Sequence, residues 1–240
     1  MPNVMRRLLT AQSTRTKLLA VLWGLFPLGT LTAQEMGGVR RAHVEIRTEL
    51  GTIVVALYNE TPQHRDNFLK LVREGAYDSL LFHRVIPGFM VQGGDPTSKR
   101  AGAGAMLGNG GPGYTLPAEI VPGLVHKKGA LAAARQGDQE NPEHRSNGSQ
   151  FYIVQGKTFT PEELQPIEQR NASYGIPLTY SEAEKRTYSS AGGAPHLDGA
   201  YTVFGEVVQG LDVIDAIAAQ PCDARDRPLK DIRMFMHVLE

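Results

Sequence analysis

Two polar side chains, Arg84 and Gln92, flank a turn in the stretch FHRVIPGFMVQGGD, which begins at Phe82. The β-prone residues before the central Pro-Gly and the alternation after it predict two short strands joined by this turn. Pairing of the strands would bring Arg84 and Gln92 together over an apolar floor of Phe89 and Met90. A fixed cation and an amide in this position can donate hydrogen bonds to the polar part of a ligand whose apolar part rests on the floor.

Two further blocks of sequence complete a pattern. Asn147 begins the block NGSQFYI, and His196 begins the block HLDG, which leads into VFG at Val203. Together with the first block, and in this order, they resemble the cyclophilin-type peptidyl-prolyl cis-trans isomerases. The resemblance extends from about Val44 to the C-terminus apart from one inserted segment. An amphipathic hairpin with a solvated arginine would explain the first block alone, but it does not explain all three.

The resemblance implies an enzyme without a cofactor that accelerates rotation about the peptide bond preceding proline. The barrier is about 18–20 kcal/mol because amide resonance must be broken, and the rotation transfers no proton. A catalyst therefore needs an apolar pocket for the ring and donors that bind the twisted amide better than the planar forms. As a hypothesis, Arg84 donates to the prolyl carbonyl and to the proline nitrogen, which becomes basic when resonance is lost. Gln92 would hold the substrate backbone.

Other candidate residues surround this pair. The resemblance places the following positions in or beside the substrate groove: Phe82, His83, Phe89, Met90, Ala134, Arg135, Tyr152, His196, Leu197 and Tyr201. We interpret His83 as structural or orienting rather than as a general base, because the reaction transfers no proton. The remaining histidines show no spacing typical of metal ligands, so no metal site is expected.

Several positions depart from the usual family pattern. Tyr152 stands where many members have phenylalanine, and its hydroxyl must find a partner or water. His196 stands where eukaryotic members carry the tryptophan associated with cyclosporin binding. Arg135 replaces an asparagine that contacts the peptide, although Ala134 and the backbone could still do so. Tyr201 replaces a histidine, as in several bacterial relatives.

Composition excludes some classes of protein. Lys plus Arg and Asp plus Glu number 25 each, so the formal net charge is zero and a nucleic-acid partner is not expected. The 26 glycines and 15 prolines suit a loop-rich β protein better than a helical bundle. The single cysteine, Cys222, excludes an intramolecular disulfide and a cysteine-based zinc site.

The N-terminal segment has the pattern of a signal peptide. Positive residues precede an apolar stretch over 18–26, and Ala33 offers a small residue at a cleavage position. Pro27 interrupts the apolar run, which is shorter than the roughly 20 residues of a membrane-spanning helix. We therefore expect a mature chain that begins near Gln34, is periplasmic or secreted, and has no stable membrane insertion. An uncleaved membrane anchor is the alternative.

The remaining pattern predicts strands with one helix early and one late. Residues 44–48 and 53–58 predict a hairpin, and Thr61 and Pro62 predict the N-cap and first turn of a helix that ends at Gly75. Further strands are predicted at 129–134, 151–154, 202–208 and 229–239, and a second helix over 211–218.

A glycine-rich segment, 102–113, contains a literal GxGxxG match. A dinucleotide site would need a helix directly after this motif, and Pro112 with the extended residues 114–117 argues against one. No Gly-Lys-Ser/Thr follows, which excludes a P-loop. We interpret the segment as a flexible surface loop beside the groove. A nucleotide-dependent enzyme remains an alternative that rests on this loop alone.

The pattern changes between Lys157 and Pro195. Thr160 and Ser181 each begin a capping box, which predicts two short inserted helices. We interpret this insertion as a solvated addition, with a dedicated partner surface as the alternative.

Together these elements predict an all-β fold, a closed eight-stranded antiparallel barrel capped by two α-helices, which the resemblance also implies. The expected domains are a signal peptide over 1–33, a linker over 34–42, and a cyclophilin-like domain over 43–240 with the insertion at 158–195. The expected partners are proline-containing unfolded or extended polypeptides, bound by a monomer. The alternative function is a proline-peptide-binding chaperone module with incidental catalysis, whose working surface is the insertion.

Because His196 replaces the tryptophan associated with cyclosporin binding, we expect weak binding of cyclosporin by a protein that keeps its isomerase activity. Titration calorimetry with cyclosporin measures the affinity, and an X-Pro isomerisation assay on the same preparation shows that the site is intact. A dissociation constant in the low nanomolar range would contradict this expectation.

Overall fold

The structure, a computed structural model, describes residues 40–176 and 178–239. The expected signal peptide, residues 1–33, lies outside the described residues, as does the 34–39 part of the expected linker. No helix in the described part of the chain is both long and apolar enough to cross a membrane.

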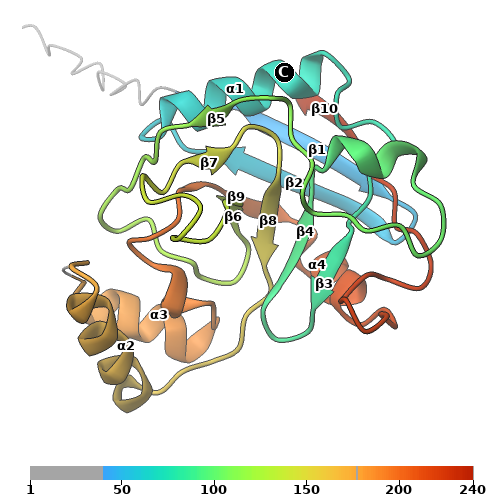
Figure 1. Ribbon diagram of the computed structural model, residues 1–240. Helices are drawn as coiled ribbons and strands as arrows, with labels where there is room; N and C mark the ends of the chain where they lie inside the picture. Colours follow the sequence, from blue (N-terminus) through green and yellow to red (C-terminus); the bar gives the residue numbers. More distant parts are fainter. Residues whose placement is uncertain (1–39, 177, 240) are drawn as a thin grey trace, which may run out of the picture. The chain divides into compact units, whose positions relative to one another are not determined.

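One antiparallel sheet of eight strands is the main element of the fold (Figure 1). Its strands lie in the order β10, β1, β2, β9, β6, β8, β4, β3. Their bounds are β1 His43–Thr48, β2 Gly51–Leu57, β3 Arg84–Ile86, β4 Met90–Gly93, β6 Ala130–Ala133, β8 Phe151–Val154, β9 Val203–Gln209 and β10 Phe235–Leu239. A separate pair is formed by β5 Thr115–Leu116 and β7 Ser146–Asn147, and two short 3-10 helices cover Pro96–Arg100 and Pro195–Leu197.

The sheet curls into an open half-barrel, and the expected closed barrel is therefore wrong. The edge strands β3 and β10 do not pair with each other in a ladder. The residues that precede them, 79–82 and 232–234, are joined by three backbone hydrogen bonds and one isolated bridge between Leu81 and Arg233. The antiparallel register of the Leu81–Arg233 bridge places β3 opposite residues 228–230 rather than opposite β10, so this contact does not join the two edge strands.

The two expected helices pack on the sheet. Helix α1, Pro62–Arg73, lies against β9 and β10, and α4, Leu211–Ala218, lies against β2, β3 and β4. Phe68 of α1 and Ile214 of α4 are buried in the main core, which lies between the helices and the curled sheet. Gly75 ends the helical segment with a φ of +64°, as the sequence predicts.

A distant carboxylate caps α1 in place of the predicted Thr61. The Thr61 hydroxyl is buried and has no hydrogen-bond partner among the described residues. Glu119 instead accepts from the backbone N–H of Gln63 at 3.1 Å and from that of His64 at 2.9 Å. Its second contact with His64, at Nδ1, is 2.6 Å long. The start of the helix was correctly predicted, but its negative cap comes from a loop that local sequence does not indicate.

The insertion contains the two predicted helices, α2 Pro161–Ser173 and α3 Glu182–Ser190. Both capping boxes, at Thr160 and Ser181, are formed. A small core of Leu164, Tyr180 and Tyr188 is fully buried and packs against Val125 of the main domain. The insertion is therefore more than the solvated addition that its polar sequence suggested.

We expect Glu119→Ala to lower the free energy of unfolding by about 1–3 kcal/mol, because it leaves two helix N–H groups and the buried His64 ring without their acceptor. Denaturant unfolding measures the change. Glu60→Ala, which removes an exposed carboxylate just before the same helix, serves as the control. Equal stability of the two variants would show that Glu119 does not cap α1.

Candidate functional site

Arg84 and Gln92 are directly opposite each other in the β3–β4 ladder, as predicted. An Nη1–H of Arg84 donates to Gln92 Oε1 at 3.4 Å, and Gln92 Nε2 donates to Gln150 Oε1 at 2.9 Å. Gln150 in turn donates to the carbonyl oxygens of Gly108 and Gly110, at 2.9 and 2.6 Å. This chain fixes the Gln92 amide with its oxygen toward the arginine.

The glycine-rich segment forms one wall of the site, and Asp95 holds it in place. Asp95 Oδ2 accepts from the backbone N–H groups of Gly108 at 2.6 Å and Gly110 at 3.2 Å, while Oδ1 accepts from Thr97 N at 2.8 Å. Burial alone would raise the pKa of Asp95, but these hydrogen bonds lower it below its ordinary value. The short strand β5 follows the segment, so the helix that a dinucleotide site needs is not there.

A pocket of about 460 Å³ opens beside Arg84. It is lined by Arg84, Phe89, Met90, Gln92, Leu107, Gly108, Asn109, Ala134, Arg135, Tyr152, Leu197 and Tyr201. Nine of the twelve predicted site residues are in this set. Met90 and Tyr152 are buried and form its floor, whereas Phe89 and Leu197 are half-buried at its side. The structure thus places a cation beside a pocket with an apolar floor that is large enough for a proline ring.

Three predicted site residues do not line this pocket. Phe82 is 1% exposed and packs edge-on against Phe151 in the main core. The prediction that Phe82 contacts the substrate is therefore wrong, and its side chain belongs to the core. His83 is buried behind the site, and its ring nitrogens have no hydrogen-bond partner among the described residues. Burial lowers the pKa of His83 despite the nearby Asp95, which favours the neutral ring and a structural role. His196 lies beside Phe89, with ring centroids 5.1 Å apart and the two rings tilted by 42°.

Arg135 is engaged with the protein rather than pointing freely into the groove. Its guanidinium lies 4.3 Å from the ring centroid of Tyr201. Its Nε donates to the Ala200 carbonyl at 3.0 Å, and Nη1 donates to Asp138 at 2.6 Å. The side chain is only 3% exposed. Arg135 therefore fixes the Tyr201 ring at the edge of the pocket.

The Tyr152 hydroxyl reaches a buried partner, His126 Nε2, at 2.9 Å. The other ring nitrogen of His126 and its backbone N–H both donate to Asp198 Oδ1, at 2.7 Å each. Asp198 Oδ2 accepts from the hydroxyls of Tyr180, at 2.9 Å, and Tyr188. Because a carboxylate only accepts, Nδ1 of His126 donates to Asp198, and in the neutral ring Nε2 accepts from the Tyr152 hydroxyl. Burial raises the pKa of Tyr152 well above its ordinary value, so the hydroxyl stays protonated.

A polar groove of about 410 Å³ continues from the pocket and shares Gln92, Asn109 and Arg135 with it. Gln150 also lines this groove, and it was missed although it lies inside the block NGSQFYI. Asp226, 3.6 Å from Arg84 Nε, was missed because nothing in its local sequence points to the site.

No cluster of metal-binding side chains occurs within residues 40–176 and 178–239.

This combination of fold and site is shared with a known family. A family model described as cyclophilin type peptidyl-prolyl cis-trans isomerase/CLD matches residues 43–238. The chain belongs to this family.

Several relatives carry the same family name. A Streptococcus pyogenes protein, whose name combines a phosphatase with a peptidyl-prolyl cis-trans isomerase, is 36% identical over 192 residues, which are 79% of this chain and 37% of that protein. Peptidyl-prolyl cis-trans isomerase-like 2 of Rhizopus delemar is 33% identical over 208 residues, or 84% of this chain and 30% of that protein. A Staphylococcus aureus protein assigned by name to these isomerases is 33% identical over 190 residues, or 79% and 87%. The chain spans well under half of the first two proteins and most of the third.

Two crystal structures of a cyclophilin-type isomerase from Cryptosporidium parvum are similar to this chain. The first has a TM-score of 0.58 and 26% sequence identity, and the match covers 83% of this chain and 98% of that one. The second, solved in the presence of the dipeptide Ala-Pro, has a TM-score of 0.57 and 26% identity, with coverages of 82% and 99%. The mainly-β cyclophilin fold is therefore confirmed.

We expect Tyr152→Phe to lower the free energy of unfolding by about 1–3 kcal/mol, because it leaves His126 Nε2 buried without a partner. Isomerase activity should be retained, since the ring still forms the pocket floor. Urea unfolding monitored by circular dichroism measures the loss.

The matched control is Tyr201→Phe, because the Tyr201 hydroxyl makes no hydrogen bond to the described residues. Equal stability of Tyr152→Phe and the wild type would mean that the bond to His126 does not contribute to folding.

Proposed function

We propose that this protein is a peptidyl-prolyl cis-trans isomerase that acts on X-Pro bonds in unfolded or extended polypeptides. The observation that carries the proposal is the Arg84 guanidinium, which lies beside a pocket with an apolar floor and has donor groups left for a ligand. Membership of the cyclophilin-type family supports it. The crystal structure of the Cryptosporidium parvum isomerase with the dipeptide Ala-Pro supports a proline-containing ligand.

Arg84 is held loosely enough to serve a substrate. Its side chain is 43% exposed, and its protein contacts are the 3.4 Å hydrogen bond to Gln92 and a 3.6 Å ion pair with Asp226. Both contacts are longer than a strong charge-assisted hydrogen bond, which is about 2.7–2.9 Å. The other N–H groups of the guanidinium make no hydrogen bond to the described residues and remain able to donate.

The proposed catalysis is differential binding of the twisted amide. Met90, Tyr152 and Phe89 take the proline ring, while Arg84 donates to the prolyl carbonyl and to the nitrogen lone pair that appears as resonance is lost. Arginine suits this role because its charge is fixed and its planar fork offers several donors. A rate enhancement of ~10⁵ would require about 7 kcal/mol of preference for the twisted form. No proton, metal or cofactor enters this scheme.

Gln92 acts in this scheme mainly as a positioning residue. Its oxygen accepts from Arg84, and one of its two amide hydrogens is used by Gln150. One hydrogen remains for the substrate backbone, which would lie along the polar groove beside the pocket. The sequence suggested that Gln92 mainly holds the substrate backbone. In this scheme it does so with one amide hydrogen, while its oxygen positions Arg84.

We also propose that the protein is exported and acts outside the cytoplasm. The charged region, the apolar stretch over 18–26 and Ala33 support export by a bacterial cell, with cleavage near Ala33 and folding of periplasmic or secreted proteins as the role. We propose that the mature protein works as a monomer. N-terminal sequencing of the purified mature protein tests the cleavage site.

We expect Arg84→Ala to lower kcat/KM for an Ala-Pro peptide on the order of 10²–10³-fold, as for removal of one preorganised transition-state donor. Arg84→Lys should recover only part of this loss, because lysine lacks the planar fork. A protease-coupled or NMR exchange assay measures the rates. Arg225→Ala is the matched control, because Arg225 is an exposed arginine adjacent to Asp226.

An unchanged rate in Arg84→Ala would contradict the proposed mechanism. A wild type that binds proline peptides without accelerating their isomerisation would contradict the proposed function, and the chaperone-module alternative would take its place.

A further inference from the structure

We propose that a second, apolar cleft binds an apolar side chain of the same polypeptide whose proline occupies the pocket. This cleft lies between the loop 120–125 and four residues of the insertion, Gly175, Ile176, Leu178 and Thr179. The inference rests on the proposed function, because it assigns an additional subsite to the same substrate. It also gives the insertion a role, which is to supply one wall of a substrate-selecting site.

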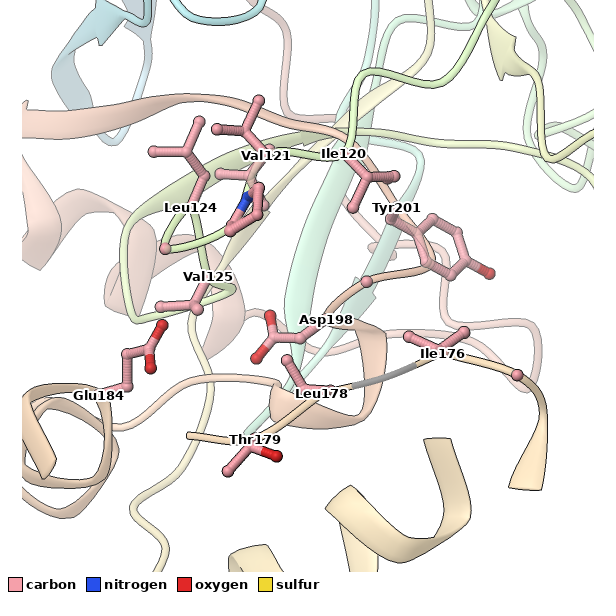
Figure 2. A pocket seen from close by; sticks show the side chains of 15 residues that line it. Ile120, Val121, Leu124, Val125, Ile176, Leu178, Thr179, Glu184, Asp198 and Tyr201 are labelled. Carbon is pink, nitrogen blue, oxygen red and sulfur yellow. The ribbon is translucent and has the colours of Figure 1, made fainter. Parts of the chain in front are cut away.

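The cleft is built from both parts of the chain (Figure 2). Its volume is about 520 Å³, within the range of about 300–1,000 Å³ that is typical of ligand pockets. Ile120 and Leu124 come from the loop, and Ile176 and Leu178 come from the insertion. Figure 2 shows Ile120 and Tyr201 at one end of the cleft and Leu124 at the other.

The acidic groups of the cleft are already engaged within the protein. Asp198 accepts hydrogen bonds from the His126 backbone and ring and from the hydroxyls of Tyr180 and Tyr188, which uses its four acceptor positions. Glu184 accepts from the backbone N–H and the hydroxyl of Ser181, at 2.7 Å each. The cleft therefore presents mainly hydrocarbon to a ligand, and its remaining negative charge disfavours an acidic side chain.

Tyr201 connects the cleft to the proline pocket, because this residue lines both. Its ring is fixed under the Arg135 guanidinium and lies edge-on to Tyr152, with centroids 6.1 Å apart. The polar groove shares lining residues with the pocket but none with the cleft. The order of sites is therefore polar groove, proline pocket, apolar cleft, which a single extended polypeptide can occupy.

The order of the three sites indicates which kind of side chain enters the cleft. A chain that places its backbone in the polar groove and its proline in the pocket continues past Tyr201 to the cleft. An extended chain advances about 3.3 Å per residue, so a side chain a few residues from the proline can reach past Tyr201 into the cleft. Leucine, isoleucine, methionine and phenylalanine side chains suit the cleft, whereas aspartate and glutamate do not.

The test scans the position of one apolar residue in a substrate peptide. The parent is an alanine-rich peptide with a single proline, and one leucine is placed in turn at each position up to about five residues on either side. The wild-type protein is assayed with every peptide by NMR exchange. We expect leucine at one or two positions, all on one side of the proline, to raise kcat/KM on the order of tenfold over the parent. Aspartate at the same positions should give no gain.

Two variants locate the effect. Ile120→Glu places a charge at the end of the cleft near Tyr201, and because Ile120 is 43% exposed the variant is expected to fold. It should remove the gain from leucine while leaving the rate for the parent peptide unchanged. Val208→Glu, at a position that is 52% exposed and does not line the cleft, is the matched control and should keep the gain.

The outcomes separate this inference from the proposed function. If the parent peptide is isomerised but leucine gives no gain at any position, the subsite is wrong and the isomerase proposal stands. A gain that persists in Ile120→Glu also overturns the inference, because the preference then arises elsewhere. If the wild type does not isomerise the parent or any leucine peptide, both proposals fail.

Discussion

Arg84 stands opposite Gln92 in the β3–β4 ladder, and the candidate site depends on this register. Because side chains alternate between the two faces of a sheet, a slip by one residue would turn Arg84 away from the pocket. The register is set by the Pro-Gly turn, in which Gly88 adopts a φ of +73°, and by the pinning of Gln92 to Gln150. The hairpin therefore positions the cation and supplies Met90 of the apolar floor, and the neighbouring strand β8 supplies Tyr152.

Three carboxylates attach the surrounding loops to this frame. Asp95 holds the glycine-rich wall, Glu119 holds the start of α1, and Asp198 joins the insertion to the pocket floor. Each accepts several hydrogen bonds from donors that would otherwise be buried without partners, so its removal would release a whole loop rather than a single contact. Asp198 connects the most distant elements, because its hydrogen-bond network extends from Tyr188 in α3 through His126 to Tyr152 in β8. The insertion and the substrate pocket thus share one buried polar network.

Patterns in the sequence correctly predicted those elements whose conformation depends on residues close together in the chain. The β3–β4 hairpin, the helix start at Pro62 and the capping boxes at Thr160 and Ser181 all depend on residues a few positions apart. The cap from Glu119 and the partner of Tyr152 come from remote loops, and no local pattern encodes them. The predicted barrel closure failed for the same reason, since it depends on how two distant edges meet. The resemblance to the family predicted most of the residues that line the pocket. It wrongly placed Phe82 at the substrate groove, because the contact of Phe82 with Phe151 in the core is visible only in the folded structure.

The central claim is that the Arg84 site accelerates rotation about the X-Pro bond and does not merely bind it. Two-dimensional NMR exchange spectroscopy of an Ala-Pro peptide with a catalytic amount of protein measures this interconversion directly. We expect exchange cross-peaks between the cis and trans resonances in the presence of the protein, because uncatalysed rotation takes tens to hundreds of seconds and gives none on this timescale. Resonances that shift or broaden on binding, without cross-peaks between the two isomers, would contradict it.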